Sequence, residues 1–259
     1  MEPVYRALEL TGVTLHRVQG ATVDLRGTEN IPTTGGAVLA MNHTGYLDFL
    51  PIALGVYRQG RRIRFLGKVE MRDNAILNYL MNHTGTVAVD RSAGHAAFEE
   101  AVEALRAGEL VGVFPEATHS RSFEIKELKS GAVRMAAAAG VPVIPVIGWG
   151  AHRQWGKDVP RTMGRARIPM IVEYGTPMDM SDVDLDSPAS VEAKVKELRD
   201  TMTAMLHPIQ EEYPHPAGEP WVPARLGGGA PTYDEAKVLE DEEAAQKAAA
   251  RAAKRESGK

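Results

Sequence analysis

The sequence predicts an α/β protein with a mixed, mostly parallel β-sheet that is covered by helices on both faces. Short runs of branched apolar residues recur between residues 22 and 174, as expected of buried strands. Segments with apolar residues at helical spacing separate these runs, and strands that alternate with helices favour this architecture. The length of 259 residues is sufficient for one domain with extensions and a sizeable core.

The elements are expected in a regular order. Residues 3–18 place apolar residues near one helical stripe and predict a short amphipathic helix within residues 1–20, which either covers the core or touches lipid. Residues 190–205 give the clearest helical pattern of the second half, with Ser190 as the expected N-cap. The expected strands are 22–26, 37–41, 63–66, 86–89, 110–114, 143–147 and 168–174, and the expected helices between them are 47–58, 73–82, 95–107 and 128–139.

The composition changes after Pro214. Several prolines and the run Gly227–Gly229 break regular structure, and residues 234–259 form a charged, alanine-rich tail that is either a solvated helix or without fixed structure. We therefore expect one domain over residues 1–226, followed by a Gly-rich linker and a charged tail over residues 227–259. The charges of the tail serve either solubility or helix–helix association.

Charge and residue usage exclude several classes of function. The formal net charge of −4 argues against a nucleic-acid partner, since such proteins usually carry a basic surplus. The chain has no cysteine, which removes disulfides, thiolate zinc sites and a cysteine nucleophile and fits a reducing compartment. Residues 1–15 lack a secretory signal, and no run approaches the ~18 apolar residues of a spanning helix. We expect a cytoplasmic protein whose contact with lipid is peripheral, on the cytoplasmic face of a membrane.

The strongest local signal is the segment Asn42–Asp48, which follows an apolar run. His43 should therefore lie at the end of a strand, where sites are usually built. Five residues rotate by about 140° on an ideal helix, so His43 and Asp48 can meet only if the histidine lies in the turn and the aspartate in the first helical turn. A carboxylate beside an imidazole fixes its tautomer and makes it a competent general base. The alternative is a chance pair.

Two other histidines have part of this pattern. The tetrapeptide Asn-His-Thr-Gly recurs at residues 82–85, but the fifth residue after His83 is Ala88, which cannot act as a carboxylate partner. We expect this copy to form a turn before a strand. His95 precedes Glu100 by five residues within an expected helix, and a structural role is predicted for it.

Residues that suit a phosphate follow other expected strands. Arg91 closes one strand and should project near the same sheet edge as His43. The segment Phe114–Ser122 closes another, and its hydroxyls, guanidinium and backbone N–H groups can bind phosphate. Lys129 and Gly131 open the next expected helix.

In this order the segments resemble the glycerolipid acyltransferase family, typified by the 1-acylglycerol-3-phosphate (lysophosphatidate) acyltransferases. The resemblance covers residues 30–180. The family's first block, a histidine and an aspartate separated by four residues and usually preceded by asparagine, is matched by Asn42, His43 and Asp48. The other matches are Lys68–Met71 to a Lys-x-Glu-Leu element, Gly85–Arg91 to a glycine–strand–arginine block, Phe114–Ser120 to Phe-Pro-Glu-Gly-Thr-Arg-Ser, and Val141–Val146 to a fourth block.

The resemblance implies acyl transfer from acyl-CoA or acyl-carrier protein to a lysophospholipid at a membrane surface, with 1-acylglycerol 3-phosphate as the default acceptor and phosphatidate as the product. It implies His43 as base and Asp48 as its orienter, no covalent acyl-enzyme, and no metal or further cofactor. The residues implied for the acceptor's phosphate are Arg91, Glu116, Thr118, Ser120, Arg121 and Lys68, supported by Asn42, Gly85, Lys129 and Gly131.

Two departures in the third block leave alternatives open. Ala117 stands where the family has glycine and His119 where it has arginine, so Arg121 is expected to supply the charge. Another acceptor is possible, namely glycerol 3-phosphate, a different lysophospholipid or a glycolipid. Two further alternatives are a relative that binds a lipid phosphate without turnover and a hydrolase in which His43, Asp48 and Glu116 hold a metal.

Two basic stretches are candidates for contact with anionic lipid. The first is a run of five cations between residues 58 and 68, and each cation near an anionic surface contributes about 1 kcal/mol. The second, residues 149–167, combines Trp149 and Trp155 with arginines and a lysine, as an interfacial loop would. In both cases the alternative is an ordinary solvated face. The five cations are Arg58, Arg61, Arg62, Arg64 and Lys68.

Overall fold

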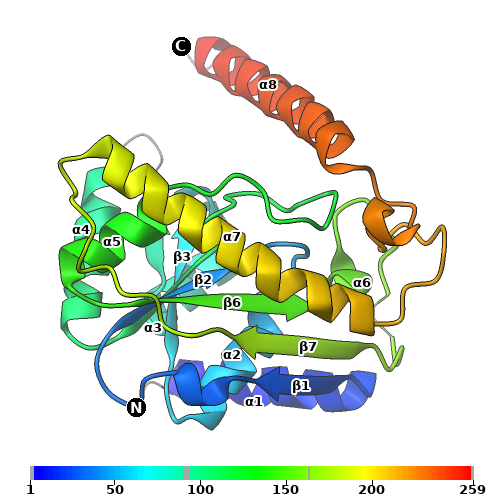
Figure 1. Ribbon diagram of the computed structural model, residues 1–259, viewed down its shortest axis with the longest axis horizontal. Helices are drawn as coiled ribbons and strands as arrows, with labels where there is room; N and C mark the ends of the chain where they lie inside the picture. Colours follow the sequence, from blue (N-terminus) through cyan, green and yellow to red (C-terminus); the bar gives the residue numbers. More distant parts are fainter. Residues whose placement is uncertain (1–2, 90–93, 163, 258–259) are drawn as a thin grey trace.

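A seven-stranded sheet forms the centre of the molecule, in the order β1-β7-β6-β2-β5-β3-β4. Figure 1 shows the computed structural model, which describes residues 3–89, 94–162 and 164–257. The strands are β1 (Thr22–Arg26), β2 (Ala37–Met41), β3 (Ile63–Lys68), β4 (Val87–Val89), β5 (Leu110–Val113), β6 (Val143–Trp149) and β7 (Pro169–Tyr174).

The sheet is mixed and mostly parallel, as predicted. Strands β6, β2, β5, β3 and β4 pair in parallel, whereas β7 pairs antiparallel with β6 and parallel with β1. Because β2 lies between β6 and β5, the carboxyl ends of three parallel strands meet at one edge of the sheet. Open α/β sheets bind their ligands at this edge.

Helices cover both faces of the sheet (Figure 1). The α-helices are α1 (Pro3–Gln19), α2 (Phe49–Arg58), α3 (Ala75–Thr84), α4 (Gly94–Arg106), α5 (Gly131–Ala139), α6 (His152–Trp155), α7 (Pro188–Glu212) and α8 (Tyr233–Ser257). Short 3₁₀ turns are η1 (Thr28–Asn30), η2 (Val69–Asp73) and η3 (Ala224–Leu226).

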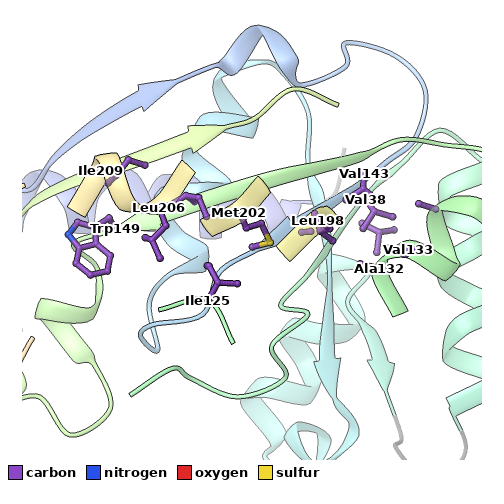
Figure 2. Packing of buried hydrophobic residues seen from close by; sticks show 14 of the residues in the cluster. Val38, Ile125, Ala132, Val133, Val143, Trp149, Leu198, Met202, Leu206 and Ile209 are labelled. Carbon is purple, nitrogen blue, oxygen red and sulfur yellow. The ribbon is translucent and has the colours of Figure 1, made fainter. Parts of the chain in front are cut away.

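Two buried clusters lie on opposite faces of the sheet. Alternate residues of β2 point to different faces, so Val38 joins the cluster with α4, α5 and α7, while Leu39 joins the cluster with α2. Both residues are fully buried. Figure 2 shows Leu198, Met202 and Leu206 of α7 in the first cluster, which fixes this long helix against the sheet.

Most expected elements are confirmed. Every predicted strand is present with its ends shifted by two residues or fewer, and a helix occupies each predicted helical segment. The prediction of Ser190 as an N-cap is wrong: α7 begins after Ser187, whose hydroxyl accepts the Ser190 N–H at 3.3 Å. His83 lies in the last turn of α3 and not in a loop, and Gly85 makes the turn with a left-handed φ of 65°. Helix α6 was not predicted from the sequence.

The segment after α7 returns to the sheet–helix body. Trp221, Val222 and Ala230 are buried in the same cluster as α7. Helix α8 then begins with a reciprocal capping box, in which Thr232 Oγ1 accepts the Glu235 N–H at 3.4 Å and Glu235 accepts the Thr232 N–H at 2.9 Å. Most of α8 lies outside the layers of the body (Figure 1). Among the described helices, none combines the length and the apolar composition needed to cross a membrane.

Candidate active site

His43 and Asp48 lie in the turn that joins β2 to α2. His43 follows the strand by two residues, and Asp48 is the residue before the helix. His43 Nδ1 is 3.3 Å from Asp48 Oδ2. The two side chains thus meet in the way that their spacing requires.

Backbone groups hold the Asp48 carboxylate in place. Its Oδ2 accepts the N–H groups of Thr44 at 2.6 Å and Gly45 at 2.7 Å, and its Oδ1 accepts the Thr44 hydroxyl at 3.3 Å. The Asp48 side chain is only 2% exposed, whereas His43 is 19% exposed. The carboxylate is therefore fixed below the surface and the imidazole stays open to a substrate. With Nδ1 directed to Asp48, Nε2 is the nitrogen left to accept a proton.

The His43 ring is clamped between two other rings. The Phe114 ring stacks on it with centroids 4.1 Å apart, and the His119 ring lies 3.8 Å away. Burial, followed by the charge on His43, lowers the pKa of His119 to about 4. His119 is thus neutral at physiological pH and adds no positive charge beside His43.

Glu116 braces the backbone of the turn. Its carboxylate accepts the N–H of His43 at 2.8 Å and the N–H of Lys126 at 3.1 Å. It is 4% exposed, and this burial raises the pKa of Glu116 to about 8, against the opposing effect of the two N–H donors. Glu116 therefore ties the loop after β5 to His43 and does not face a substrate.

The loop between β5 and α5 lies over the turn that carries His43. The Ser120 N–H donates to the His43 carbonyl at 2.7 Å. Ala117 and Phe123 of this loop have φ angles of 63° and 60°, in the left-handed region that favours glycine. Ala117 is the position at which the family resemblance implies glycine, so the backbone retains the conformation although the residue differs.

An apolar cavity of about 290 Å³ opens beside His43. It runs between β3, β5, α4 and α5, and apolar side chains form most of its wall. Two cations, Lys68 and Lys129, lie on its lining. The apolar lining residues are Leu66, Val89, Ala97, Phe98, Val113, Phe114, Ala132 and Met135.

The predicted phosphate-binding residues differ in their surroundings. Lys68 lines the cavity with His43, as do two of the supporting residues, Lys129 and Gly131. Ser120 is buried and its hydroxyl donates to the Glu124 carbonyl at 2.8 Å, so it holds the loop. Arg91 lies outside the described residues.

Thr118 and Arg121 have partners of their own. Thr118 Oγ1 accepts from Lys126 Nζ at 2.5 Å. Arg121 pairs with Asp158 at 2.7 Å and with Glu243 of α8 at 2.8 Å. The Arg121 guanidinium is therefore covered by carboxylates and does not replace the family arginine at the cavity.

The other two supporting residues, Asn42 and Gly85, have structural contacts. The Asn42 amide exchanges two hydrogen bonds with the backbone of Gly148, at 3.1 and 2.7 Å, and so joins the ends of β2 and β6. A side chain at Gly85 would lie 2.5 Å from the Arg64 guanidinium, and Gly85 is absent from the cavity lining. Both residues shape the backbone around the site.

The described residues contain no group of three or more histidine, aspartate or glutamate side chains placed to hold a metal ion. Glu116 would be needed as a ligand beside His43 and Asp48, but its two oxygens face backbone N–H groups. Within the part of the chain that the structure describes, the metal-dependent hydrolase therefore has no ligand set.

Several site residues escaped the sequence reading. His119 was identified only as a departure from the family block, although its ring contacts His43. No local pattern in the sequence connects Lys126, within the loop between β5 and α5, or Lys157, after α6, with His43. A helical signal at residues 152–155 was too short to detect.

Several residues of the two basic stretches, 58–68 and 149–167, make contacts within the protein. Arg61 donates to the carbonyls of Pro32 and Gly108, and Arg64 pairs with Glu109. Trp149 is 2% exposed within the core, so the prediction that it belongs to an interfacial loop is wrong. Trp155 stacks under Arg161, whose guanidinium carbon is 4.1 Å from the ring centroid.

The fold and the site define an acyltransferase domain. Residues 22–149 match the model of the family described as Acyltransferase. Residues 22–149 form a domain of this family, and the chain is an O-acyltransferase by class.

The named relatives are 1-acyl-sn-glycerol-3-phosphate acyltransferases. The chain is 27% identical over 161 residues to that of Bacillus subtilis, covering 62% of this chain and 75% of the relative. It is 32% identical over 134 residues to a probable enzyme of the same name from Mycoplasma pneumoniae, covering 50% of each chain. The chain thus spans only about half the length of some relatives.

A solved structure has the same fold. It is the 1-acyl-sn-glycerophosphate acyltransferase PlsC of Thermotoga maritima, with a TM-score of 0.61 and 21% identity, covering 83% of this chain and 86% of that one.

Proposed function

We propose that the protein transfers a fatty acyl group from a thioester, acyl-CoA or acyl-carrier protein, to the free hydroxyl of 1-acylglycerol 3-phosphate. The product is phosphatidate. The observation that carries this proposal is the His43–Asp48 pair, 3.3 Å apart, at the mouth of an apolar cavity. The names of the curated relatives support the choice of acceptor.

The mechanism is direct attack assisted by a general base. His43 Nε2 removes the proton of the acceptor hydroxyl while the oxygen attacks the thioester carbonyl. The C–S bond breaks as the new ester C–O bond forms, and the thiolate leaves and takes up the proton. Asp48 stabilises the imidazolium in between. General-base assistance of this kind contributes about 10²–10⁴-fold to the rate.

The cavity suits an acyl chain. Its apolar wall removes methylene groups from water, and each buried methylene contributes about 0.8 kcal/mol. His43 stands at its lining, so a chain inserted there brings its carbonyl carbon toward the base.

The phosphate of the acceptor would be held at the rim of the cavity. Lys68 and Lys129 line the cavity together with His43 and supply positive charge. Arg91 follows β4, which is parallel to β3, so the chain leaves that strand at the same sheet edge as Lys68. These three cations are the proposed phosphate ligands.

A different acceptor is the second candidate. It is favoured by one observation: the position of the family arginine is His119, which is neutral, and Arg121 is paired with carboxylates. A headgroup with less negative charge than a phosphomonoester would suit such a site. Glycerol 3-phosphate, another lysophospholipid and a glycolipid are the acceptors to compare.

Peripheral attachment to the cytoplasmic face of a membrane is part of the proposal. Large apolar side chains are exposed on α1, α2, η2 and α3, and α1 packs against both α2 and α3. Isolated exposed apolar residues are normal, whereas a group on adjoining helices indicates an interaction surface. These residues are Leu10, Val18, Phe49, Tyr57, Met71, Ile76, Leu77 and Tyr79.

An acceptor panel tests the proposed function. Purified protein is mixed with palmitoyl-CoA and, in separate reactions, with 1-acylglycerol 3-phosphate, glycerol 3-phosphate, a lysophosphatidylcholine and a lysoglycolipid. Released thiol gives the rate and mass spectrometry identifies the product. We expect phosphatidate as the main product. Release of free fatty acid without any acylated acceptor would contradict acyl transfer.

A further inference from the structure

Three cations lie in or beside the loop that lies over His43. Arg121 and Lys126 belong to the loop itself, and Lys157 follows α6. Their side chains are 16%, 13% and 14% exposed, so they are largely withdrawn from solvent. Lys126 Nζ also lies 3.5 Å from the carbonyl of His119, whose ring contacts His43. The three positive charges are therefore connected with the candidate active site through this loop and His119, although none of them lines the cavity.

Two carboxylates of α8 form ion pairs with these cations. Glu240 pairs with Lys126 at 2.6 Å, and Glu243 pairs with Arg121 at 2.8 Å and with Lys157. The Arg121 backbone N–H donates to Glu240 at 3.4 Å as well. Every one of these contacts joins residues more than 80 positions apart in the sequence. Helix α8 thus contacts the loop next to His43 although it lies far from it in the sequence.

The sequence of α8 places these groups on one face of the helix. Ala236, Glu240 and Glu243 follow each other by four and three residues, the spacing of a single helical face. Ala236 is buried, whereas the neighbouring Asp241 and Glu242 are exposed. The helix therefore meets the body through one narrow face in its first three turns, and the rest of it extends outward (Figure 1).

The local charge balance depends on α8. Without the helix, Arg121, Lys126 and Lys157 face only Asp158 among the carboxylates of this cluster, which leaves a positive surplus. Glu240 and Glu243 cancel it. In addition, Arg121 Nε is buried and lacks a hydrogen-bond partner within the described part of the chain. The Arg121 guanidinium thus has one donor that the carboxylates of α8 do not use.

We propose that Arg121, Lys126 and Lys157 form a phosphate-binding subsite beside His43, and that Glu240 and Glu243 of α8 occupy it as an internal competitor. Phosphate oxygens are the ligands that a guanidinium and two ammonium groups bind best, and the carboxylates of α8 stand in for them. The ligand is a phosphate group of the acyl donor or of a lipid headgroup. This choice of ligand rests on the proposed function. Binding of such a phosphate requires that α8 release the three cations.

Binding measurements without turnover test the competition. Full-length wild type is compared with the double variant Glu240→Gln/Glu243→Gln. The matched control is Asp241→Asn/Glu242→Gln, which removes the same charge from the exposed side of the same turn. Coenzyme A in solution, followed by calorimetry, represents the donor phosphates. Flotation with phosphatidylcholine vesicles, with and without phosphatidylglycerol, represents the headgroup phosphates.

We expect the double variant to bind coenzyme A or the anionic vesicles about five- to tenfold more tightly than wild type, and the control to stay within about twofold. A gain with coenzyme A alone assigns the subsite to the donor, and a gain with vesicles alone assigns it to the lipid. A third variant adds Arg121→Gln to the double variant and should abolish the gain. Equal binding by wild type and double variant, or a gain that survives Arg121→Gln, would overturn the proposal.

Because no reaction is needed, failure of this test leaves the proposed acyl transfer standing. Conversely, a chain without acyl transfer activity could still show the gain in phosphate binding. Circular dichroism and thermal unfolding of each variant check that the fold is retained.

Discussion

Asp48 has two kinds of partner in one turn, the backbone N–H groups of Thr44 and Gly45 and the ring of His43. Because the backbone donors fix the carboxylate, the imidazole meets a partner that is already oriented. Glu116 fixes the backbone of His43 from the other side. At the scale of residues, two buried acidic side chains thus hold one partly exposed histidine, and the precision of the site comes from this support.

Ala117 carries strain that a glycine would remove. Its φ of 63° is costly for a residue with a Cβ and freely accessible to glycine. We expect Ala117→Gly to raise the free energy of unfolding by about 0.5–1 kcal/mol, measured by urea denaturation. Ala193→Gly, at an exposed interior position of α7, is the control and should lower it by a similar amount. A destabilised Ala117→Gly protein would show that the left-handed conformation is absent in solution.

Glu116 should make stability depend on pH. Its pKa is raised from 4.5 in the unfolded chain to about 8 by burial, so the folded state binds more protons between these values. The contribution of Glu116 to the free energy of unfolding is therefore full below pH 4.5 and is lost as the pH rises through about 8.

The variant Glu116→Gln tests this dependence. Its amide cannot accept from both backbone N–H groups, which costs about 1–3 kcal/mol, but it has no proton to lose. We expect the free energy of unfolding, measured with urea, to decrease less between pH 5 and pH 8.5 in the variant than in wild type. The same decrease in both proteins would count against the raised pKa.

At the scale of elements, what could be predicted was local. The strands β2, β5 and β6 are continuous apolar runs because both faces are buried, and such runs are visible in the sequence. The contact between His43 and Asp48 was predictable because five residues and one turn separate them. The partners of Arg121 were not, since Glu243 lies 122 residues away on a helix whose composition indicates only solubility or association. Charge pairs between distant elements have no signal in a single sequence.

The cavity between α4 and α5 should set the length of the acyl chain. Gly131 lines it at the start of α5, and a Cβ placed there meets no atom within 4 Å. We expect Gly131→Leu to fold normally and to reduce the rate with palmitoyl-CoA relative to octanoyl-CoA about tenfold, the effect of about two displaced methylenes. Ala139→Leu, at the far end of the same helix, should leave this ratio unchanged. An unaltered ratio in Gly131→Leu would show that the chain binds elsewhere.

At the scale of the whole molecule, the exposed apolar side chains and the site lie on connected elements. Tyr46 and Phe49 belong to the turn and helix that follow His43 and are 44% and 39% exposed. Ile76 and Tyr79 of α3 are exposed as well, at 71% and 52%. A membrane that covered these residues would bring lipid acceptors to the mouth of the cavity.

This surface should bind vesicles. We expect Ile76→Asp/Tyr79→Asp to reduce flotation with phosphatidylglycerol-containing vesicles at least about fivefold, since two apolar contacts are lost and two negative charges are added. The control is Val238→Asp/Leu239→Asp on the exposed side of α8, with the same change of charge and polarity. Equal loss in both variants would indicate a general effect of charge and no docking face.

The central claim is that His43 is the base for acyl transfer. The sequence contains its own control, because Asn-His-Thr-Gly occurs twice and His83 is exposed on α3, where its Nδ1 lies 2.7 Å from the carbonyl of Tyr79. Steady-state turnover of palmitoyl-CoA with 1-acylglycerol 3-phosphate should fall about 10²–10⁴-fold in His43→Ala and stay near wild type in His83→Ala. A His43→Ala protein that turns over at the wild-type rate would contradict the account.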